Sequence, residues 1–174
     1  MLWTPPIGAI GLTYSTGWAN VRATIGHTLA GESSHYTQAF IVIDAERVME
    51  AGHCGARVAD RRDYVGRYVL YGWLPDLSAH QREEVARAAL SLDGVGYSLL
   101  DYLIFLRRRM RPERPAPPYG LLPVQLVSET YRRAGINLLD LLDSGEAVVT
   151  LSALGEAFMS RREWEMHAPA GRYS

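Results

Sequence analysis

The most restrictive feature of this chain is a pair of short apolar runs separated by a turn. The first run extends from Thr37 to Asp44 and the second from Arg47 to Glu50, with the turn formers Asp44-Ala45-Glu46 between them. β-Branched and aromatic residues bounded by turn formers are typical of strands, so this stretch predicts a β-hairpin. The hairpin in turn favours a fold built on an antiparallel sheet.

The two ends of this hairpin carry side chains that could take part in catalysis. His35 precedes the first strand and Glu50 ends the second. Because a hairpin brings its open ends together, we expect Glu50 to hydrogen-bond His35. An imidazole oriented by a carboxylate is the base-and-orienter half of a nucleophilic triad. The alternative is a structural role for each residue, which is the commoner outcome for a single His and a single Glu.

The remaining pattern adds helices and further strands. Ser78 and Gln81 form a capping box ahead of an apolar helix face, and Pro123 opens a helix that Gly135 ends. The spacing predicts further helices over 18–29, 97–110 and 152–160, and further strands over 7–14, 56–58 and 68–73. The prediction is an α+β fold, an antiparallel sheet packed against three or four helices, in one domain spanning 1–174.

Composition excludes several classes of function. A net charge of -1 argues against binding nucleic acid through bulk electrostatics, and a single cysteine excludes an internal disulfide framework and a Cys-based zinc site. No metal and no cofactor is predicted. The N-terminus lacks the basic region of a secretory signal, and the longest apolar run, 99–106, is too short to span a membrane. We therefore expect a cytoplasmic or virion-associated protein. All 18 basic residues are arginine, which indicates a GC-rich genome such as that of an actinobacterium or one of its phages.

A series of short motifs occurs in a recognisable order between Gly8 and Leu154. The motifs are Gly8-Ala9-Ile10, Ser34-His35, Glu50-Ala51-Gly52, Gly55-Ala56-Arg57-Val58, Tyr64 with Gly66, Gly94 with Tyr97, Pro123-Val124-Gln125-Leu126-Val127, and Ala134-Gly135-Ile136. Together they resemble the circularly permuted, NlpC-like branch of the papain-like cysteine peptidases and amidases, the YiiX-like group. The resemblance implies a papain-like fold.

The resemblance also implies acyl-transfer chemistry on cell-wall peptides or acyl amides. In that family a cysteine at a helix N-terminus is the nucleophile, because the helix dipole and a nearby His favour its thiolate. By resemblance His35 is the base, Glu50 orients it, and Tyr97 is a wall of the site or a neighbour of the oxyanion. Residues beside these positions are expected to contact a ligand: Ser34, Val124 and Gln125.

The chain departs from this family at the nucleophile. Pro123 stands at the position of the cysteine, and Ala9 replaces the aspartate of the first strand. We therefore predict a catalytically impaired hydrolase homologue that acts as a binding or structural module, phage- or cell-wall-associated. Its expected partner is a cell-wall peptide or an assembly protein. The alternative is an active amidase or peptidase with a relocated nucleophile, either Cys54 or Ser128.

Overall fold

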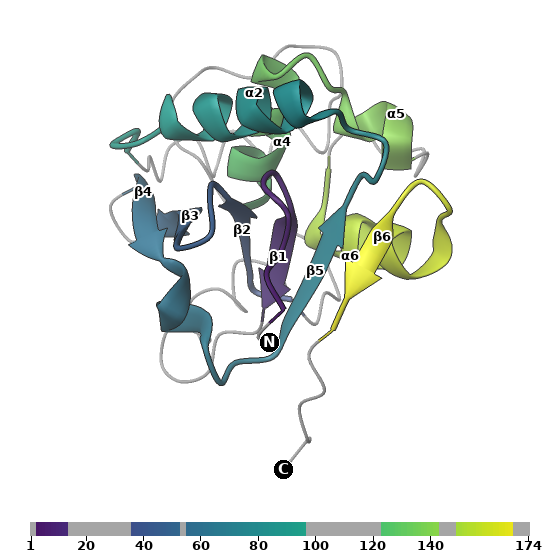
Figure 1. The fold of residues 1–174 in the computed structure, drawn as a ribbon, viewed down its shortest axis with the longest axis horizontal. Helices are drawn as coiled ribbons and strands as arrows, with labels where there is room; N and C mark the ends of the chain where they lie inside the picture. Colours follow the sequence, from purple (N-terminus) through teal and green to yellow (C-terminus); the bar gives the residue numbers. More distant parts are fainter. Residues whose placement is uncertain (1–2, 14–35, 53–54, 97–122, 143–148, 169–174) are drawn as a thin grey trace, which may run out of the picture.

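The computed structural model describes residues 3–13, 36–52, 55–96, 123–142 and 149–168. Within them, six antiparallel strands form one sheet in the order β4-β3-β2-β1-β5-β6, and four α-helices and a short 3₁₀ helix accompany it (Figure 1). The elements are β1 (Ile10–Thr13), β2 (Gln38–Val42), β3 (Arg47–Gly52), β4 (Gly55–Asp60), η1 (Arg61–Tyr64), β5 (Val69–Trp73), α2 (Ala79–Leu90), α4 (Pro123–Arg133), α5 (Leu138–Leu142), α6 (Leu151–Ser160) and β6 (Glu165–His167). The predicted α+β class is confirmed.

The predicted hairpin is present as β2 and β3. Asp44 sets its turn, because one carboxylate oxygen accepts hydrogen bonds from the backbone N–H groups of Glu46 at 2.9 Å and Arg47 at 2.8 Å. The strand predicted to end at Glu50 continues to Gly52. Glu50 therefore lies inside β3, opposite Phe40, and does not end the strand.

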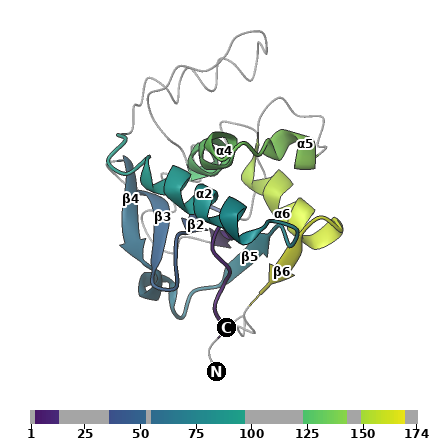
Figure 2. The ribbon, with the colours of Figure 1, turned by 45° about the horizontal axis from the view of Figure 1, so that its top comes forward.

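The sheet separates two cores of different size. The helices cover one face, where they enclose the larger of the two, which we call the main core; Figure 2 shows α2, α4 and α6 on this side of the sheet. The opposite face carries a smaller second core, made of Ala9, Phe40, Val42, Val48, Tyr64, Val69 and Tyr71. Side chains alternate between the two faces along each strand, so a residue's position in the strand decides which core it joins.

The second core is tightly packed at the centre of the sheet. Phe40 is fully buried and lies across from Gly11 on β1. A Cβ on Gly11 would come within 2.2 Å of the Phe40 ring, so a glycine is required at this position. The Phe40 ring also packs on Tyr64, with 4.2 Å between the ring centroids.

The edge of the sheet at β4 is covered by backbone from the segment after α2. The Ala56 N–H donates to the Val95 carbonyl at 2.8 Å, and the Ala56 carbonyl accepts from the Gly94 N–H at 2.9 Å. Asp93 accepts a further bond from the Val58 N–H at 3.3 Å. The outward-facing N–H and C=O groups of Ala56 and the N–H group of Val58 are thus already paired within the chain.

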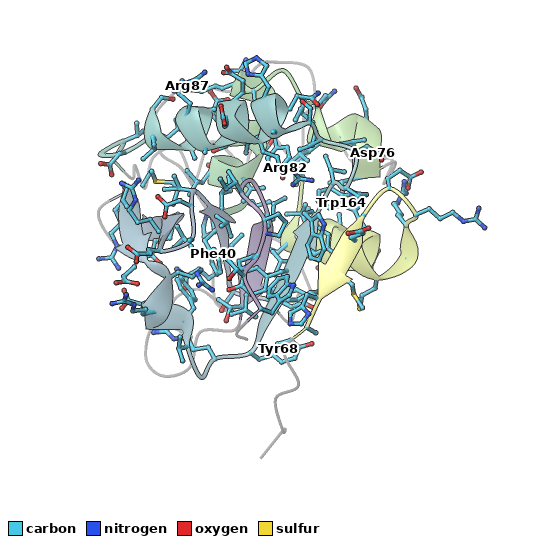
Figure 3. All side chains as sticks on the ribbon, viewed as in Figure 1. Phe40, Tyr68, Asp76, Arg82, Arg87 and Trp164 are labelled. Carbon is cyan, nitrogen blue, oxygen red and sulfur yellow. The ribbon has the colours of Figure 1, made fainter. Side chains whose placement is uncertain are left out.

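Helix α2 begins as the sequence predicts. The Ser78 hydroxyl accepts from the Gln81 N–H at 3.2 Å, and the Gln81 side chain accepts from the Ser78 N–H at 2.9 Å. Arg82, on the side of α2 that faces the sheet, donates to the carbonyls of Ile7 and Leu74 (Figure 3). These bonds fix α2 to the loops at one end of β1 and β5.

Replacing Ser78 with alanine is expected to lower the free energy of unfolding by about 1 kcal/mol, because α2 loses its N-cap. Denaturant unfolding measures this loss. The control is Ser160→Ala, at an exposed serine that ends α6 and donates only to the carbonyl of Glu156. We expect it to change stability by less than about 0.5 kcal/mol. Equal effects of the two changes would contradict the role of the cap.

Some predicted elements differ from the structure. The first strand was predicted over 7–14; among the described residues of that range it forms at Ile10–Thr13 and not at 7–9, while β4 is longer than predicted and extends to Asp60. Helix α6 is confirmed and begins at Leu151. Three elements were not predicted: η1, α5 and β6. The helices predicted over 18–29 and 97–110 lie outside the described residues.

Candidate functional site

The helix expected to carry the nucleophile is present as α4, with Pro123 as its first described residue. Helix α4 is described from Pro123 onwards and buries Val124, Leu126, Val127, Thr130 and Tyr131. Proline suits the first turn of a helix, because its fixed φ is helical and the N–H that it lacks would have no partner within the helix. The half-buried Pro123 side chain offers no thiol, hydroxyl or amine.

Helix α4 runs along β2 from the start of that strand towards its end. Near the helix C-terminus, the Tyr131 hydroxyl donates to the Gly8 carbonyl at 2.6 Å, and the Gly8 N–H donates to the carbonyl of Val42, the last residue of β2. Since α4 packs on β2, its first turn lies towards Gln38, the first residue of that strand. The structure thus brings the N-terminus of α4 and the start of β2 to the same end of the sheet.

Glu50 is the buried centre of a cluster of polar side chains on β2, β3, β4 and η1. The residue is only 5% exposed. One carboxylate oxygen accepts from the Arg57 Nε at 2.7 Å. The other accepts from the Tyr64 hydroxyl and from the Gln38 amide, the latter at 3.2 Å. We call Gln38, Glu50, Arg57 and Tyr64 the Glu50 cluster.

The Glu50 cluster lies on the face of the sheet opposite α4. Glu50 pairs across the strands with Phe40, which belongs to the second core, whereas its neighbours Met49 and Ala51 face the main core. Helix α4 packs into the main core. The Glu50 carboxylate therefore points away from the helix that begins at Pro123.

Tyr64 acts as a hydrogen-bond donor in this cluster. Burial raises the pKa of its hydroxyl, and the bond to Glu50 raises the pKa further, so the hydroxyl keeps its proton. Arg67 lies over the Tyr64 ring, with its guanidinium carbon 5.3 Å from the ring centroid. A protonated hydroxyl beside a carboxylate satisfies both buried groups, which is the arrangement expected of a structural network.

The structure describes only some of the predicted site residues. Ser34, His35, Cys54 and Tyr97 lie outside the described residues, so the predicted bond between Glu50 and His35 stays a prediction. Val124 is buried in the main core. Two other residues of α4 are half-buried: Gln125 in its first turn, and Ser128 in its middle, away from the helix N-terminus.

The partners of Glu50 were not singled out as site residues from the sequence. A signal for one of them exists. Strands β3 and β4 are joined by two residues, with Gly52 opposite Gly55, and counting back from that turn places Glu50 opposite Arg57. Opposite charges on facing positions of antiparallel strands attract each other. Gln38 and Tyr64 gave no such signal.

Buried tyrosines predict a loss of stability at alkaline pH. Burial raises the pKa of Tyr131 as well as that of Tyr64, so both stay neutral in the folded chain. In the unfolded chain they ionise near the ordinary value of about 10. Below about pH 10 both hydroxyls are neutral in either state, and their burial adds its full share to the free energy of unfolding. Above that pH, each tyrosine lowers the free energy of unfolding by about 1.4 kcal/mol per pH unit. Urea unfolding of the wild type and of Tyr64→Phe/Tyr131→Phe at rising pH measures this, and parallel losses in the two proteins would contradict it.

Comparison with known proteins identifies the fold and no closer relationship. A scan of protein-family models and a search of curated proteins found no match. Among solved structures, the chain is similar to the crystal structure of the metalloprotein YiiX from Escherichia coli O157:H7. The two share 13% identity at a TM-score of 0.63, over 98% of this chain and 100% of that chain. The fold is therefore YiiX-like.

Two further features of the described residues bear on function. They contain no group of three or more His, Cys, Asp or Glu side chains placed to hold a metal ion. Within the same residues, no helix has both the length and the apolar character needed to cross a membrane.

Proposed function

We propose that this chain is a catalytically impaired homologue of the papain-like, NlpC-like hydrolases and acts as a binding or structural module within one domain spanning 1–174. The observation that supports it is Pro123 in the helix α4, as the first residue of the helix that the structure describes. In the family that the sequence resembles, this position holds the cysteine nucleophile. Proline has neither a nucleophilic side chain nor a backbone N–H, so acyl transfer at this site has no attacking atom.

The rest of the proposed site is suited to binding. The start of β2 and the first turn of α4 lie towards the same end of the sheet, and His35 and Ser34 directly precede Tyr36, the first described residue ahead of β2. We propose that Ser34, His35 and Gln125 contact a ligand there, beside Val124. Glu50 as orienter and Tyr97 as a wall of the site remain part of this proposal. The proposed ligand is a cell-wall peptide or the surface of an assembly partner, in the cytoplasm or in a virion.

The chemistry of the structural neighbour is not carried over. YiiX is a metalloprotein, but the described residues of this chain do not supply a donor set for a metal ion. No step of the proposed function uses a metal. Fold similarity at this identity supports a shared scaffold, and function depends on the residues placed upon it.

The proposal predicts that the wild-type protein does not hydrolyse cell-wall peptides in a thiol-dependent way. Purified protein is incubated with peptidoglycan peptides, with and without iodoacetamide, beside Cys54→Ala. We expect no iodoacetamide-sensitive release of product and no difference between the two proteins. Removing the nucleophile of a triad leaves only the weak catalysis of binding and oxyanion stabilisation. Hydrolysis that iodoacetamide and Cys54→Ala both abolish would overturn the proposal and make Cys54 the nucleophile.

A further inference from the structure

Helix α6 has a glycine in its interior, at a position where alanine would favour the helix more. Gly155 lies in the middle of Leu151–Ser160 and is buried. A glycine inside a helix weakens it, and it commonly marks a place where another group packs closely. That group is the ring of Tyr36, since a Cβ on Gly155 would come within 2.6 Å of the ring. The glycine thus makes room for one aromatic side chain.

The helix that contacts Tyr36 is itself fixed on the sheet. Its Phe158 ring covers Gly72 of β5, where an added Cβ would come within 2.4 Å of the ring. Leu154 and Ala157, on the same helix, are buried in the main core. The Tyr36 ring is half-buried against this core and therefore rests on a helix that has little room to shift.

The backbone beside Tyr36 is fixed as well. The Thr37 N–H donates to the carbonyl of Thr13, the last residue of β1, at 3.1 Å. The chain therefore enters β2 through a point that is held by the ring on α6 and by the backbone on β1. Consecutive Cα atoms are about 3.8 Å apart, so the backbone of His35 begins within one residue of this fixed point.

We propose that Tyr36, in contact with Gly155, is a positioning residue that sets where His35 lies relative to the first turn of α4. The inference rests on the proposed function, in which His35 contacts a ligand at this end of the sheet. Tyr36 and Val127 of α4 pack against the same core, so the ring lies on the face of the sheet that α4 covers. A side chain in a site keeps its geometry when packing locks the residues behind it. Tyr36 on α6 supplies that lock for His35.

A thiol at the start of α4 reports whether the imidazole lies nearby. The reporter is Pro123→Cys/Val124→Ser in a Cys54→Ala background, and the measurement is the pH profile of its alkylation by iodoacetamide. A neighbouring imidazole favours the thiolate, so His35→Ala should lower the rate near pH 6.5 by about threefold or more. This comparison tests the proposed site before Tyr36 is changed.

The contact between Tyr36 and α6 is tested by adding one methyl group. Gly155→Ala must displace the Tyr36 ring, and it should lower the reporter rate to a similar extent as His35→Ala. When both changes are combined, the rate should match that of His35→Ala alone, because Tyr36 acts through His35. The control, Ala157→Gly, weakens the same helix at a buried position without adding an atom beside Tyr36. It should leave the reporter rate unchanged.

The outcomes separate the role of Tyr36 from the proposed site. If Gly155→Ala does not fold, Tyr36→Ala removes the ring without adding bulk and should cause the same loss of rate, whereas Tyr36→Phe should keep the rate. A loss in His35→Ala without one in Gly155→Ala or Tyr36→Ala overturns the positioning role alone. So does a Gly155→Ala loss that persists in the absence of His35, since that change would then act on α4 directly. No effect of His35→Ala contradicts the proposed site and, with it, the role of Tyr36.

Discussion

Replacing Pro123 with cysteine and Val124 with serine is expected to create a thiol that reacts about tenfold faster with iodoacetamide near pH 6.5 than an ordinary cysteine does. The helix dipole and, as we propose, the imidazole of His35 would favour the thiolate, and a thiol whose pKa falls from about 8.5 towards 6 is mostly ionised at that pH. The gain in thiolate exceeds the loss of intrinsic nucleophilicity that accompanies a lower pKa. The variant is made in a Cys54→Ala background, so that it carries one thiol.

The same helix supplies the control for this experiment. Ser128→Cys places a half-buried thiol in the middle of α4, where it lies beyond the effect of the helix N-terminus. Rates are compared as pH profiles, which report the pKa of each thiol independently of its exposure. His35→Ala in the Pro123→Cys/Val124→Ser variant should raise the pKa of the new thiol. If the profiles at 123 and 128 coincide, the site at the start of α4 no longer activates a nucleophile, and the proposed relation to cysteine hydrolases loses its support.

Removing the Glu50 carboxylate is expected to cost about 2–3 kcal/mol of unfolding free energy. Glu50→Ala leaves the buried Tyr64 hydroxyl and the Gln38 amide without their acceptor, and breaking a buried charged pair commonly costs about 3–5 kcal/mol. The Arg57 side chain is 65% exposed, so its charge regains water and the cost falls below that range. Chemical denaturation of the variant and the wild type gives the difference.

Two further changes test whether the buried contacts account for that loss. Arg57→Ala leaves the buried Glu50 carboxylate without its cation but keeps its bonds from Tyr64 and Gln38, so it should cost less than Glu50→Ala. Glu46→Ala removes an exposed carboxylate of the same hairpin, 3.8 Å from Arg62, and should change stability by less than about 0.5 kcal/mol. A loss in Glu50→Ala no larger than in Glu46→Ala would mean that the cluster does not stabilise the fold, and would favour the predicted role of Glu50 beside His35.

The sequence predicted the elements that combine a turn or capping signal with an apolar pattern matching their buried face. The hairpin followed from a buried apolar strand and the Asp44 turn, α2 from its capping box, and α4 from Pro123 and the apolar spacing behind it. Helix α5 has only five residues, too few to show a helical period. Strand β6 is exposed and reads Glu-Met-His, which lacks β-branched residues; its pairing to β5 depends on tertiary contacts.

The candidate site was predicted in part, and the limit lies in strand register. The start of α4 follows from residues close together in sequence. The position of Glu50 depends on where β3 ends, and the two residues beyond it, Ala51 and Gly52, still pair with β4. Because side chains alternate along a strand, this position decides that Glu50 lies beside Phe40 in the second core and away from α4.

The backbone of Gly94 and Val95, which covers β4, should reduce aggregation of the protein at high concentration. Exposed strand edges are templates on which chains add to one another and aggregate. At β4 the outward groups of Ala56 are already bonded, and at the other edge β6 offers only three residues, one of them the charged Glu165. Neither edge presents a long run of free backbone within the described residues. Both edges of the sheet are therefore poor templates for the addition of strands from other chains. Substitutions at Asp93 to Val95 are expected to expose the β4 edge and to favour such addition.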